Sequence, residues 1–187
     1  MNLFGHGLPA STLKNLLDAS YGGETPKGWS KDKALSTNQN KVFVGPSGQV
    51  VVAHRGTKGT AQSNNAIYGL TGTTGYKQTG RYKKAARVQA AAEAKYGKVI
   101  TIGHSQGGLL AQELGNDEII TLNKATRPGD VLKRKKKKQT DVSSSNDLVS
   151  SFGRPSDKTI KANSFSPLTE HATDVLDRLG SEYLGLL

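Results

Sequence analysis

The chain has 187 residues, enough for one domain with its own hydrophobic core, so neither a second domain nor a structural metal is required. It contains no cysteine, which excludes disulfides, thiolate nucleophiles and cysteine-based zinc sites. Twenty-six basic and fifteen acidic residues give a formal charge of +11, which favours anionic partners such as phospholipid surfaces, nucleic acid or a capsid interior.

The sequence shows no targeting segment and no membrane-spanning segment. Residues 1–17 lack the basic and continuous apolar regions of a secretory signal peptide, and no stretch has about 18 consecutive apolar residues. We therefore expect a soluble intracellular protein that folds as a single domain over residues 1–187.

The first part of the chain changes from a helical pattern to a strand pattern. Apolar residues recur at helical spacing over 11–19, which predicts a short helix within an N-terminal lead-in of residues 1–40. The β-branched runs at 41–44 and 49–54 surround a GPSG turn and predict a hairpin. Residues 57–80 are rich in Gly, Thr and Asn, which predicts a long exposed connection of the kind that often forms a lid.

Helices and strands alternate after this connection. An alanine-rich stretch predicts a helix over 81–96, and KVITI predicts a buried strand at 98–102. A helix at 109–114 and a strand at 118–122 follow. This alternation favours an α/β fold with a mostly parallel central sheet flanked by helices. Beyond residue 123 the pattern is interrupted, and the last predicted element is a helix over 171–179.

The segment GHSQGG has the pattern of a nucleophile elbow centred on Ser105. The crowded strand-to-helix turn of this motif requires small residues two positions before and two positions after the serine, and Gly103 and Gly107 meet that requirement. A predicted strand precedes the segment and a predicted helix follows it, which is the context that the motif needs. Ser105 is therefore the candidate nucleophile of a serine hydrolase.

A serine nucleophile requires a base, and the chain order in this architecture is serine, acid, histidine. The other three histidines precede Ser105, so His171 is the candidate base. Asp147 is the favoured acid, because it follows a serine-rich loop and precedes an apolar pair, while Asp130 and Asp141 remain open. The further acidic candidates in this interval are Asp117, Glu118, Asp157 and Glu170.

The developing oxyanion of an acyl-transfer reaction requires two fixed hydrogen-bond donors. Gln106 follows the nucleophile directly and supplies the first by position. The segment HRGT ends a predicted strand, where Gly56 permits close backbone approach and Thr57 offers an amide and a hydroxyl. We expect Thr57 and Gln106 to form the oxyanion hole of a mechanism that requires neither a metal nor a cofactor.

Two of these segments together resemble the class 3, fungal-type triacylglycerol lipases. AHRGT resembles the FRGT or RGS segment of that family, and GHSQGG resembles its GHSLGG. RYKKAA resembles the start of the family's helix before the elbow strand, and SSNDLVSS resembles the stretch with the triad aspartate. The resemblance extends from about residue 42 to 179.

This resemblance implies an α/β-hydrolase fold and hydrolysis of carboxylic esters of lipids. It also implies a catalytic triad of Ser105, Asp147 and His171, with Thr57 and Gln106 as oxyanion donors. Compact hydrolases of this kind occur in viral genomes as well, so a virion-associated location is a second expectation.

Six consecutive cations predict a solvated basic loop at residues 133–138. They are Lys133, Arg134, Lys135, Lys136, Lys137 and Lys138. Its role stays open between docking on an anionic membrane surface, a nuclear address or nucleic-acid patch, and a solvated loop with no dedicated partner. Aromatic residues make up 6% of the chain and none interrupts the run, so nucleic acid is a disfavoured partner. The alternative function is a non-catalytic or virion-associated scaffold that binds anionic partners through this loop.

Overall fold

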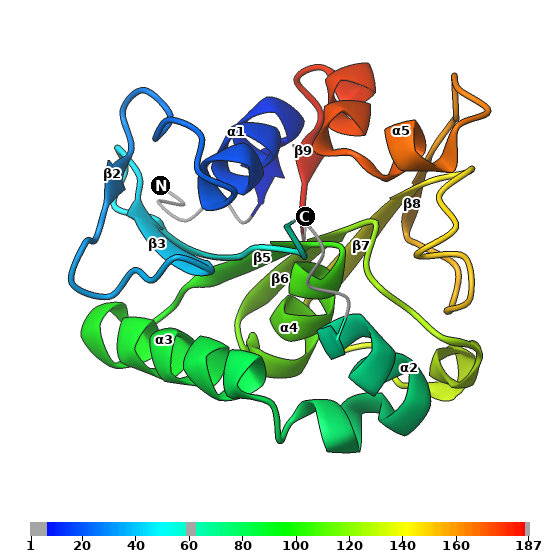
Figure 1. The fold of residues 1–187 in the computed structure, drawn as a ribbon. Helices are drawn as coiled ribbons and strands as arrows, with labels where there is room; N and C mark the ends of the chain where they lie inside the picture. Colours follow the sequence, from blue (N-terminus) through cyan, green and yellow to red (C-terminus); the bar gives the residue numbers. More distant parts are fainter. Residues whose placement is uncertain (1–6, 59–62, 186–187) are drawn as a thin grey trace.

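A seven-stranded sheet is the framework of the computed structural model, which describes residues 7–58 and 63–185 (Figure 1). Its order is β2-β3-β4-β5-β6-β7-β8; β2 and β4 run antiparallel to β3, and β4 to β8 are parallel. The strands are β2 (Ser30–Lys31), β3 (Asn40–Val44), β4 (Val50–His54), β5 (Ile100–His104), β6 (Glu118–Leu122), β7 (Gln139–Ser144) and β8 (Lys158–Ile160). The predicted α/β class, with a mostly parallel sheet in one compact domain, is confirmed.

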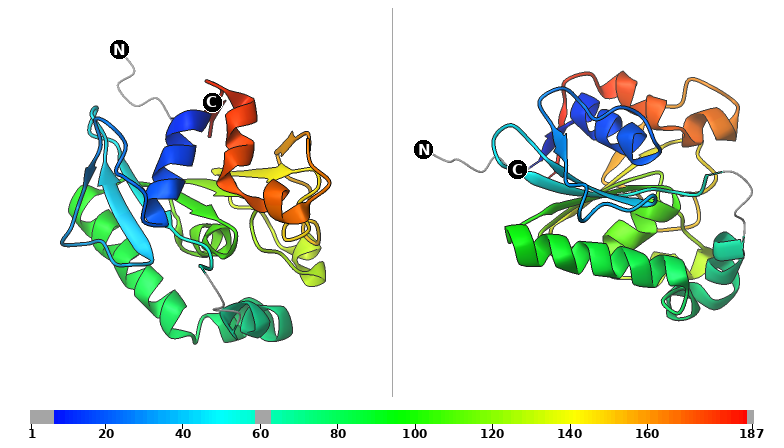
Figure 2. Two further views of the ribbon diagram at one scale, coloured as in Figure 1. Left: turned by 45° about the horizontal axis from the view of Figure 1, so that its top comes forward. Right: turned by 60° about the vertical axis from the view of Figure 1, so that its left-hand side comes forward.

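Helices cover both faces of this sheet (Figures 1 and 2). α1 (Ala10–Ser20) packs beside the 3-10 helix η2 (Thr173–Leu179) on one face, and α3 (Gly80–Tyr96) and α4 (Gln106–Leu114) cover the other. α3 and α4 are the crossover connections that neighbouring parallel strands require. The remaining elements are α2 (Ser63–Tyr76), the 3-10 helix η1 (Pro128–Leu132), α5 (Pro167–His171), and the paired strands β1 (Leu8–Pro9) and β9 (Tyr183–Leu184). None of the helices in these ranges is long and apolar enough to cross a membrane.

Apolar runs in the sequence account for the core between these layers. Every residue of β4 and β6 is buried, because central strands of a parallel sheet are covered on both faces. On α1, Leu13, Leu16 and Leu17 are buried within the same cluster as residues of the central strands, as their helical spacing predicts. The predicted first helix, the hairpin, the alanine-rich helix and the strands and helix around Ser105 are confirmed.

The connection predicted over residues 57–80 is exposed over most of its described residues, as expected, but it is not irregular, because it contains α2. Two helical pieces meet at Gly72, whose φ of 65° and ψ of −157° interrupt the helix. Asn, Gly and Thr give the segment a low helix propensity. Tertiary packing compensates, since the rings of Tyr68 and Tyr76 are buried and contact each other edge to face. Residues 59–62 of the predicted lid lie outside the described residues.

The strand β7 has no apolar pattern, yet most of it is buried. Its side chains are polar except for one valine, and they find partners inside the protein. Asp141 accepts a hydrogen bond from Thr121 Oγ1 at 2.6 Å and forms an ion pair with Lys124 at 2.9 Å. A buried polar strand of this kind is invisible to hydrophobic periodicity, which explains why no strand is predicted after residue 123.

The helix predicted over 171–179 is the 3-10 helix η2, which begins at Thr173, and His171 is the last residue of the separate helix α5. α5 ends at His171, Ala172 is extended with φ −71° and ψ 161°, and η2 follows. The carbonyl oxygen of His171 accepts a hydrogen bond from His104 Nε2 at 2.6 Å. The last carbonyl of α5 therefore has a side-chain donor in place of a donor from a continuing helix.

The basic run is not the fully solvated loop that its charge predicts. Lys133 and Lys135 form ion pairs with Asp130 and Asp157, and Lys136 Nζ donates to two carbonyl oxygens at the carboxyl end of α4, at 2.6 and 3.1 Å. Nearby carboxylates and the unpaired carbonyls of a helix end therefore bind half of the run. The cations that stay exposed are Arg134, Lys137 and Lys138.

We predict that His54 makes the fold sensitive to acid. His54 is completely buried, its Nδ1 lies 2.8 Å from the Asn40 Oδ1 and its Nε2 lies 3.2 Å from the Gln89 Oε1, and burial lowers its pKa from 6.5 to about 4. The unfolded chain takes up this proton below a pH of about 6.5, whereas the folded protein does so only near 4. The free energy of unfolding should therefore fall as the pH drops through this window, by up to about 3 kcal/mol from this group.

Urea denaturation between about pH 7 and about pH 4.5 measures this effect. A His54→Gln variant has no titrating group at the position, so its stability should depend less steeply on pH than that of the wild type. An identical pH dependence in the two proteins would contradict the prediction.

Candidate active site

Ser105 lies in a strained turn between β5 and α4. Its φ is 56° and its ψ is −127°, a backbone conformation that residues other than glycine rarely adopt. A Cβ atom on Gly103 would lie 2.0 Å from the carbonyl oxygen of Gly107, and one on Gly107 would lie 1.9 Å from the carbonyl oxygen of His54. The turn therefore requires glycine at both positions, and its geometry is that of a nucleophile elbow.

His171 and Asp147 are joined by a hydrogen bond between Nδ1 and Oδ1 at 2.7 Å. Burial by itself would raise the pKa of the Asp147 carboxyl, but the hydrogen bonds from His171 and Ser150 hold that pKa below its usual range. An ionised carboxylate accepts a hydrogen bond from Nδ1–H, which leaves the Nε2 lone pair as the proton acceptor of the ring. The pair has the electronic arrangement of a general base with its orienting acid.

The two acids that the sequence left open, Asp130 and Asp141, have other partners. Asp141 pairs with Lys124, and Asp130 pairs with Lys133 and with the Tyr68 hydroxyl. The remaining sequence candidates have other contacts: Asp117 accepts from the Val99 amide, Asp157 pairs with Lys135, Glu170 pairs with Arg178, and Glu118 is buried at the start of β6. Within the described part of the chain, Asp147 is the acid that contacts the His171 ring.

His104 connects the elbow to the backbone of His171. A carbonyl oxygen only accepts, so Nε2 of His104 donates to the His171 oxygen at 2.6 Å, and Nδ1 accepts from the Tyr21 hydroxyl at 2.8 Å. Tyr21 also receives a hydrogen bond from the Gly56 amide. Burial and, to a lesser extent, the neighbouring His171 lower the pKa of His104 to about 4, so this ring is neutral near neutral pH.

Sequence reasoning missed this link through Tyr21. Tyr21 lies 83 positions before His104, directly after α1. In the sequence it belongs to a short segment that only indicates the end of a helix. Tyr21 joins three parts of the candidate site: Gly56 of the oxyanion segment, His104 of the elbow and, through His104, the base His171. No local pattern in the sequence signals such a contact.

The predicted oxyanion residues lie together beside Ser105. A Cβ atom on Gly56 would be 3.0 Å from the Ser105 Cβ, so the HRGT backbone touches the elbow. Thr57 Oγ1 is 3.4 Å from Gln106 Oε1, in a hydrogen bond that the threonine donates. Gln106 is the first residue of α4, where a backbone N–H has no partner within the helix. The arrangement suits binding of a negative oxygen next to Ser105.

One contact of a complete triad is missing in the described residues. No hydrogen bond joins the Ser105 hydroxyl to the His171 ring. The His171 ring instead lies against the ring of His104, the residue before Ser105, with ring centroids 4.9 Å apart. Nucleophile–base hydrogen bonds are often long or absent without substrate and form in the Michaelis complex. The Ser105 and His171 side chains would have to rotate when substrate binds for this hydrogen bond to form.

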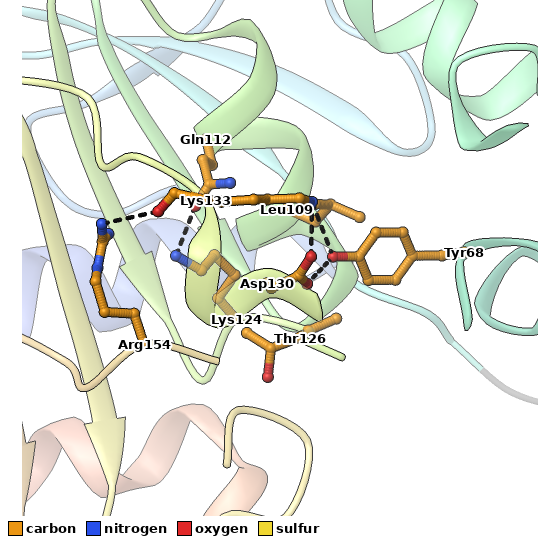
Figure 3. A pocket seen from close by; sticks show the side chains of 9 residues that line it. Tyr68, Leu109, Gln112, Lys124, Thr126, Asp130, Lys133 and Arg154 are labelled. Atoms are coloured by element: carbon orange, nitrogen blue, oxygen red, sulfur yellow. Dashed lines mark hydrogen bonds and ion pairs between the residues drawn. The ribbon is translucent and has the colours of Figure 1, made fainter. Parts of the chain in front are cut away.

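A small pocket beside η1 and α4 is separate from these residues (Figure 3). Its lining consists of Tyr68, Leu109, Gln112, Lys124, Ala125, Thr126, Asp130, Lys133 and Arg154. Lys133 pairs with Asp130 at 2.8 Å, and Lys124 Nζ donates to Gln112 at 2.7 Å. Because these lysines already have partners, their contacts hold η1 in place and do not form an anion site. Nowhere in residues 7–58 and 63–185 are three His, Cys, Asp or Glu side chains grouped to hold a metal ion.

Comparison with known proteins adds no family assignment. A scan against protein-family models and a search of curated proteins found no match to this chain. The chemistry of Ser105, Asp147 and His171 is therefore inferred from their geometry and from the two sequence motifs around them.

We predict that Gly107→Ala destabilises the protein by about 3 kcal/mol or more, because the new methyl group would overlap the His54 carbonyl in a packed core. Gly80→Ala is the matched control, since Gly80 is the first residue of α3 and a Cβ there meets no atom within 4 Å. It should be neutral or stabilising by up to about 1 kcal/mol. Urea denaturation measures both variants, and equal effects would contradict the close approach at the elbow.

We also predict that Tyr21→Phe costs about 1–3 kcal/mol of stability, because it removes the donor to His104 Nδ1 and the acceptor of the Gly56 amide. Tyr183→Phe is the control, because the Tyr183 side chain is exposed. Thermal unfolding of both variants is the measurement. A Tyr21→Phe protein as stable as the control would show that this contact contributes nothing to the site.

Proposed function

We propose that this protein is a serine carboxylic-ester hydrolase with an α/β-hydrolase fold that acts on lipid esters. The observation that supports this most directly is the Asp147–His171 hydrogen bond next to a serine in a strained strand-to-helix turn. The acid, the base and the turn come from the loops after β7, β8 and β5, all at the carboxyl edge of the parallel sheet. Catalytic residues of open α/β sheets lie at that edge.

Acylation is the first half of the proposed reaction. His171 Nε2 takes the proton from Ser105 Oγ as that oxygen attacks the ester carbonyl carbon. The carbonyl oxygen becomes an oxyanion, which the backbone amides of Gln106 and Thr57 stabilise. The carbonyl reforms as the C–O bond of the alcohol breaks, and the imidazolium of His171 gives its proton to the departing alkoxide. The Asp147 carboxylate stabilises the charged ring throughout.

Deacylation repeats these steps with water as the nucleophile. His171 removes a proton from water, the hydroxide oxygen attacks the acyl-enzyme, and the bond to Ser105 Oγ breaks as the serine recovers its proton. The products are a carboxylic acid and free enzyme. The two buried neighbours, His54 and His104, have pKa values of about 4, so neither competes for protons near neutral pH.

Lipid esters are the proposed substrate class because of the sequence motifs. AHRGT and GHSQGG, which resemble segments of class 3 lipases, lie in contact, with Gly56 of the first against Ser105 of the second. A pair of motifs that are distant in sequence and adjacent in space is a more specific signal than either motif alone. Acyl chain length and head group depend on pocket shape.

A non-catalytic scaffold for anionic partners is the second candidate function. The observation that favours it is the set of exposed cations in the basic run, Arg134, Lys137 and Lys138, in a chain with a net charge of +11. The other three cations of the run have protein partners, which leaves three of the six side chains exposed for such a role. Salt-sensitive binding of a polyanion without hydrolysis of any ester would favour this candidate over the enzyme.

A fluorophosphonate probe tests the proposed nucleophile. We expect labelling of one residue, Ser105, and complete loss of labelling in Ser105→Ala, whereas Ser47→Ala, a change in an exposed turn, should label like the wild type. Labelling that survives Ser105→Ala would reject Ser105 as the nucleophile.

The acid–base pair is tested by the turnover of short-chain esters. His171→Ala and Asp147→Asn should each lower kcat by about 10³- to 10⁴-fold, the second because an amide no longer holds the imidazole in the right tautomer. Asp157→Asn is the matched control, because Asp157 is an exposed aspartate that pairs with Lys135. Full activity of Asp147→Asn would reject the assigned acid.

A further inference from the structure

The exposed apolar side chains of this protein are unevenly distributed. Among the described residues, every large apolar side chain that is exposed, except Tyr183, comes from four segments: α2, η1, the loop after β7 and the stretch that leads into α5. These side chains are Ile67, Leu70, Val131, Leu132, Leu148, Val149, Phe152, Phe165 and Leu168, called here the apolar rim. Phe165 is 102% exposed, and Leu132, Leu70 and Leu168 are 84–87% exposed.

Hydrogen bonds connect each of the four segments to a neighbouring one. Asn146 donates to the Ser164 carbonyl at 3.1 Å, which joins the loop after β7 to the stretch before α5. The Thr126 amide donates to the Val149 carbonyl at 3.1 Å, and Lys133 Nζ donates to Thr73 at 2.6 Å, which joins that loop to η1 and η1 to α2. In Figure 1, α2 and α5 both lie toward the right-hand end of the sheet, α5 above it and α2 below it.

The apolar rim adjoins the candidate active site. Leu168 and His171 are three positions apart on α5, so they lie on neighbouring turns of one helix face. Leu148 follows Asp147 directly. Exposed large apolar residues that come from adjacent segments are unusual on a protein surface and mark a site of contact with another apolar body.

The charge of the residues around the apolar rim indicates what kind of partner it contacts. Residues 123–171, which supply most of the rim, contain eleven basic and five acidic residues. Three of these acids, Asp141, Asp147 and Glu170, are buried against Lys124, His171 and Arg178, so they contribute little negative charge to the surface. The exposed cations near the rim are Arg134 and Lys161, and neither has an ion pair within the described residues.

We propose that the apolar rim docks this protein onto an anionic phospholipid surface. The exposed Phe and Leu side chains would enter the acyl region, and the flanking Lys and Arg side chains would contact the lipid phosphates. This inference rests on the proposed function, because docking through the rim would bring His171 and Ser105 to the surface that holds the ester. It assigns the docking to the apolar rim, with Arg134 as the exposed cation of the basic run beside it.

Vesicle flotation with Ser105→Ala protein tests the docking without turnover. Vesicles contain either equal parts of phosphatidylglycerol and phosphatidylcholine or phosphatidylcholine alone. We expect the protein to bind the anionic vesicles, and Phe165→Ser with Leu168→Ser to weaken this binding by roughly ten-fold or more. A second pair from the other end of the rim, Leu70→Ser with Leu132→Ser, should do the same, while Tyr183→Ser should stay within about two-fold of the parent.

Each remaining outcome is informative. Equal binding by all variants, or equal binding to neutral and anionic vesicles, would overturn the proposal. A dimer in sedimentation velocity that the rim variants abolish would assign the rim to a second copy of the chain instead. Circular dichroism and thermal unfolding identify any variant that fails to fold, and the two independent pairs keep the test decisive. Because flotation uses Ser105→Ala protein, its failure is distinguishable from a failure of fluorophosphonate labelling in the wild type.

Discussion

The close approach of three backbone segments at the elbow is the constraint on which the rest of the site depends. His54 at the end of β4 pairs in register with Gly103 of β5, and the His54 carbonyl lies where a side chain on Gly107 would have to be. The Ser105 amide is fixed from the other side by the Leu122 carbonyl of β6 at 3.0 Å. Two neighbouring strands therefore hold Ser105 in a backbone conformation that it would not adopt alone. The stability of the parallel sheet fixes the position of the Ser105 hydroxyl in this way.

Three buried or partly buried histidines near this turn differ through their partners. His54 is held by two amide side chains inside the core, and His104 is held between the Tyr21 hydroxyl and the His171 carbonyl. Both have pKa values of about 4, so they stay neutral and act as fixed spacers. His171 alone among these three has a carboxylate on Nδ1, which is the partner that makes an imidazole useful as a base.

The sequence predicted the central elements well because their physics is local. Continuous apolar strands, a glycine-flanked serine and an alanine-rich helix are each visible in a short window. The pairing of Asp147 with His171 was favoured by chain order and resemblance, and the structure brings the two side chains together. What the sequence could not show depends on distant partners: the polar strand β7 satisfied by Thr121 and Lys124, the helix α2 anchored by its tyrosines, and the link through Tyr21. The charge of the basic run also gave a wrong expectation of full solvation, since Lys133 pairs with the nearby Asp130, while Lys135 and Lys136 have partners about twenty positions away.

The most direct test of the central claim is a crystal structure of the protein after reaction with an alkyl phosphonate. The account predicts a covalent bond from Ser105 Oγ to phosphorus, the phosphoryl oxygen within hydrogen-bond distance of the Gln106 and Thr57 amides, and His171 Nε2 turned toward the adduct. A phosphonate on another residue would contradict it. So would an adduct on Ser105 whose phosphoryl oxygen points away from both amides.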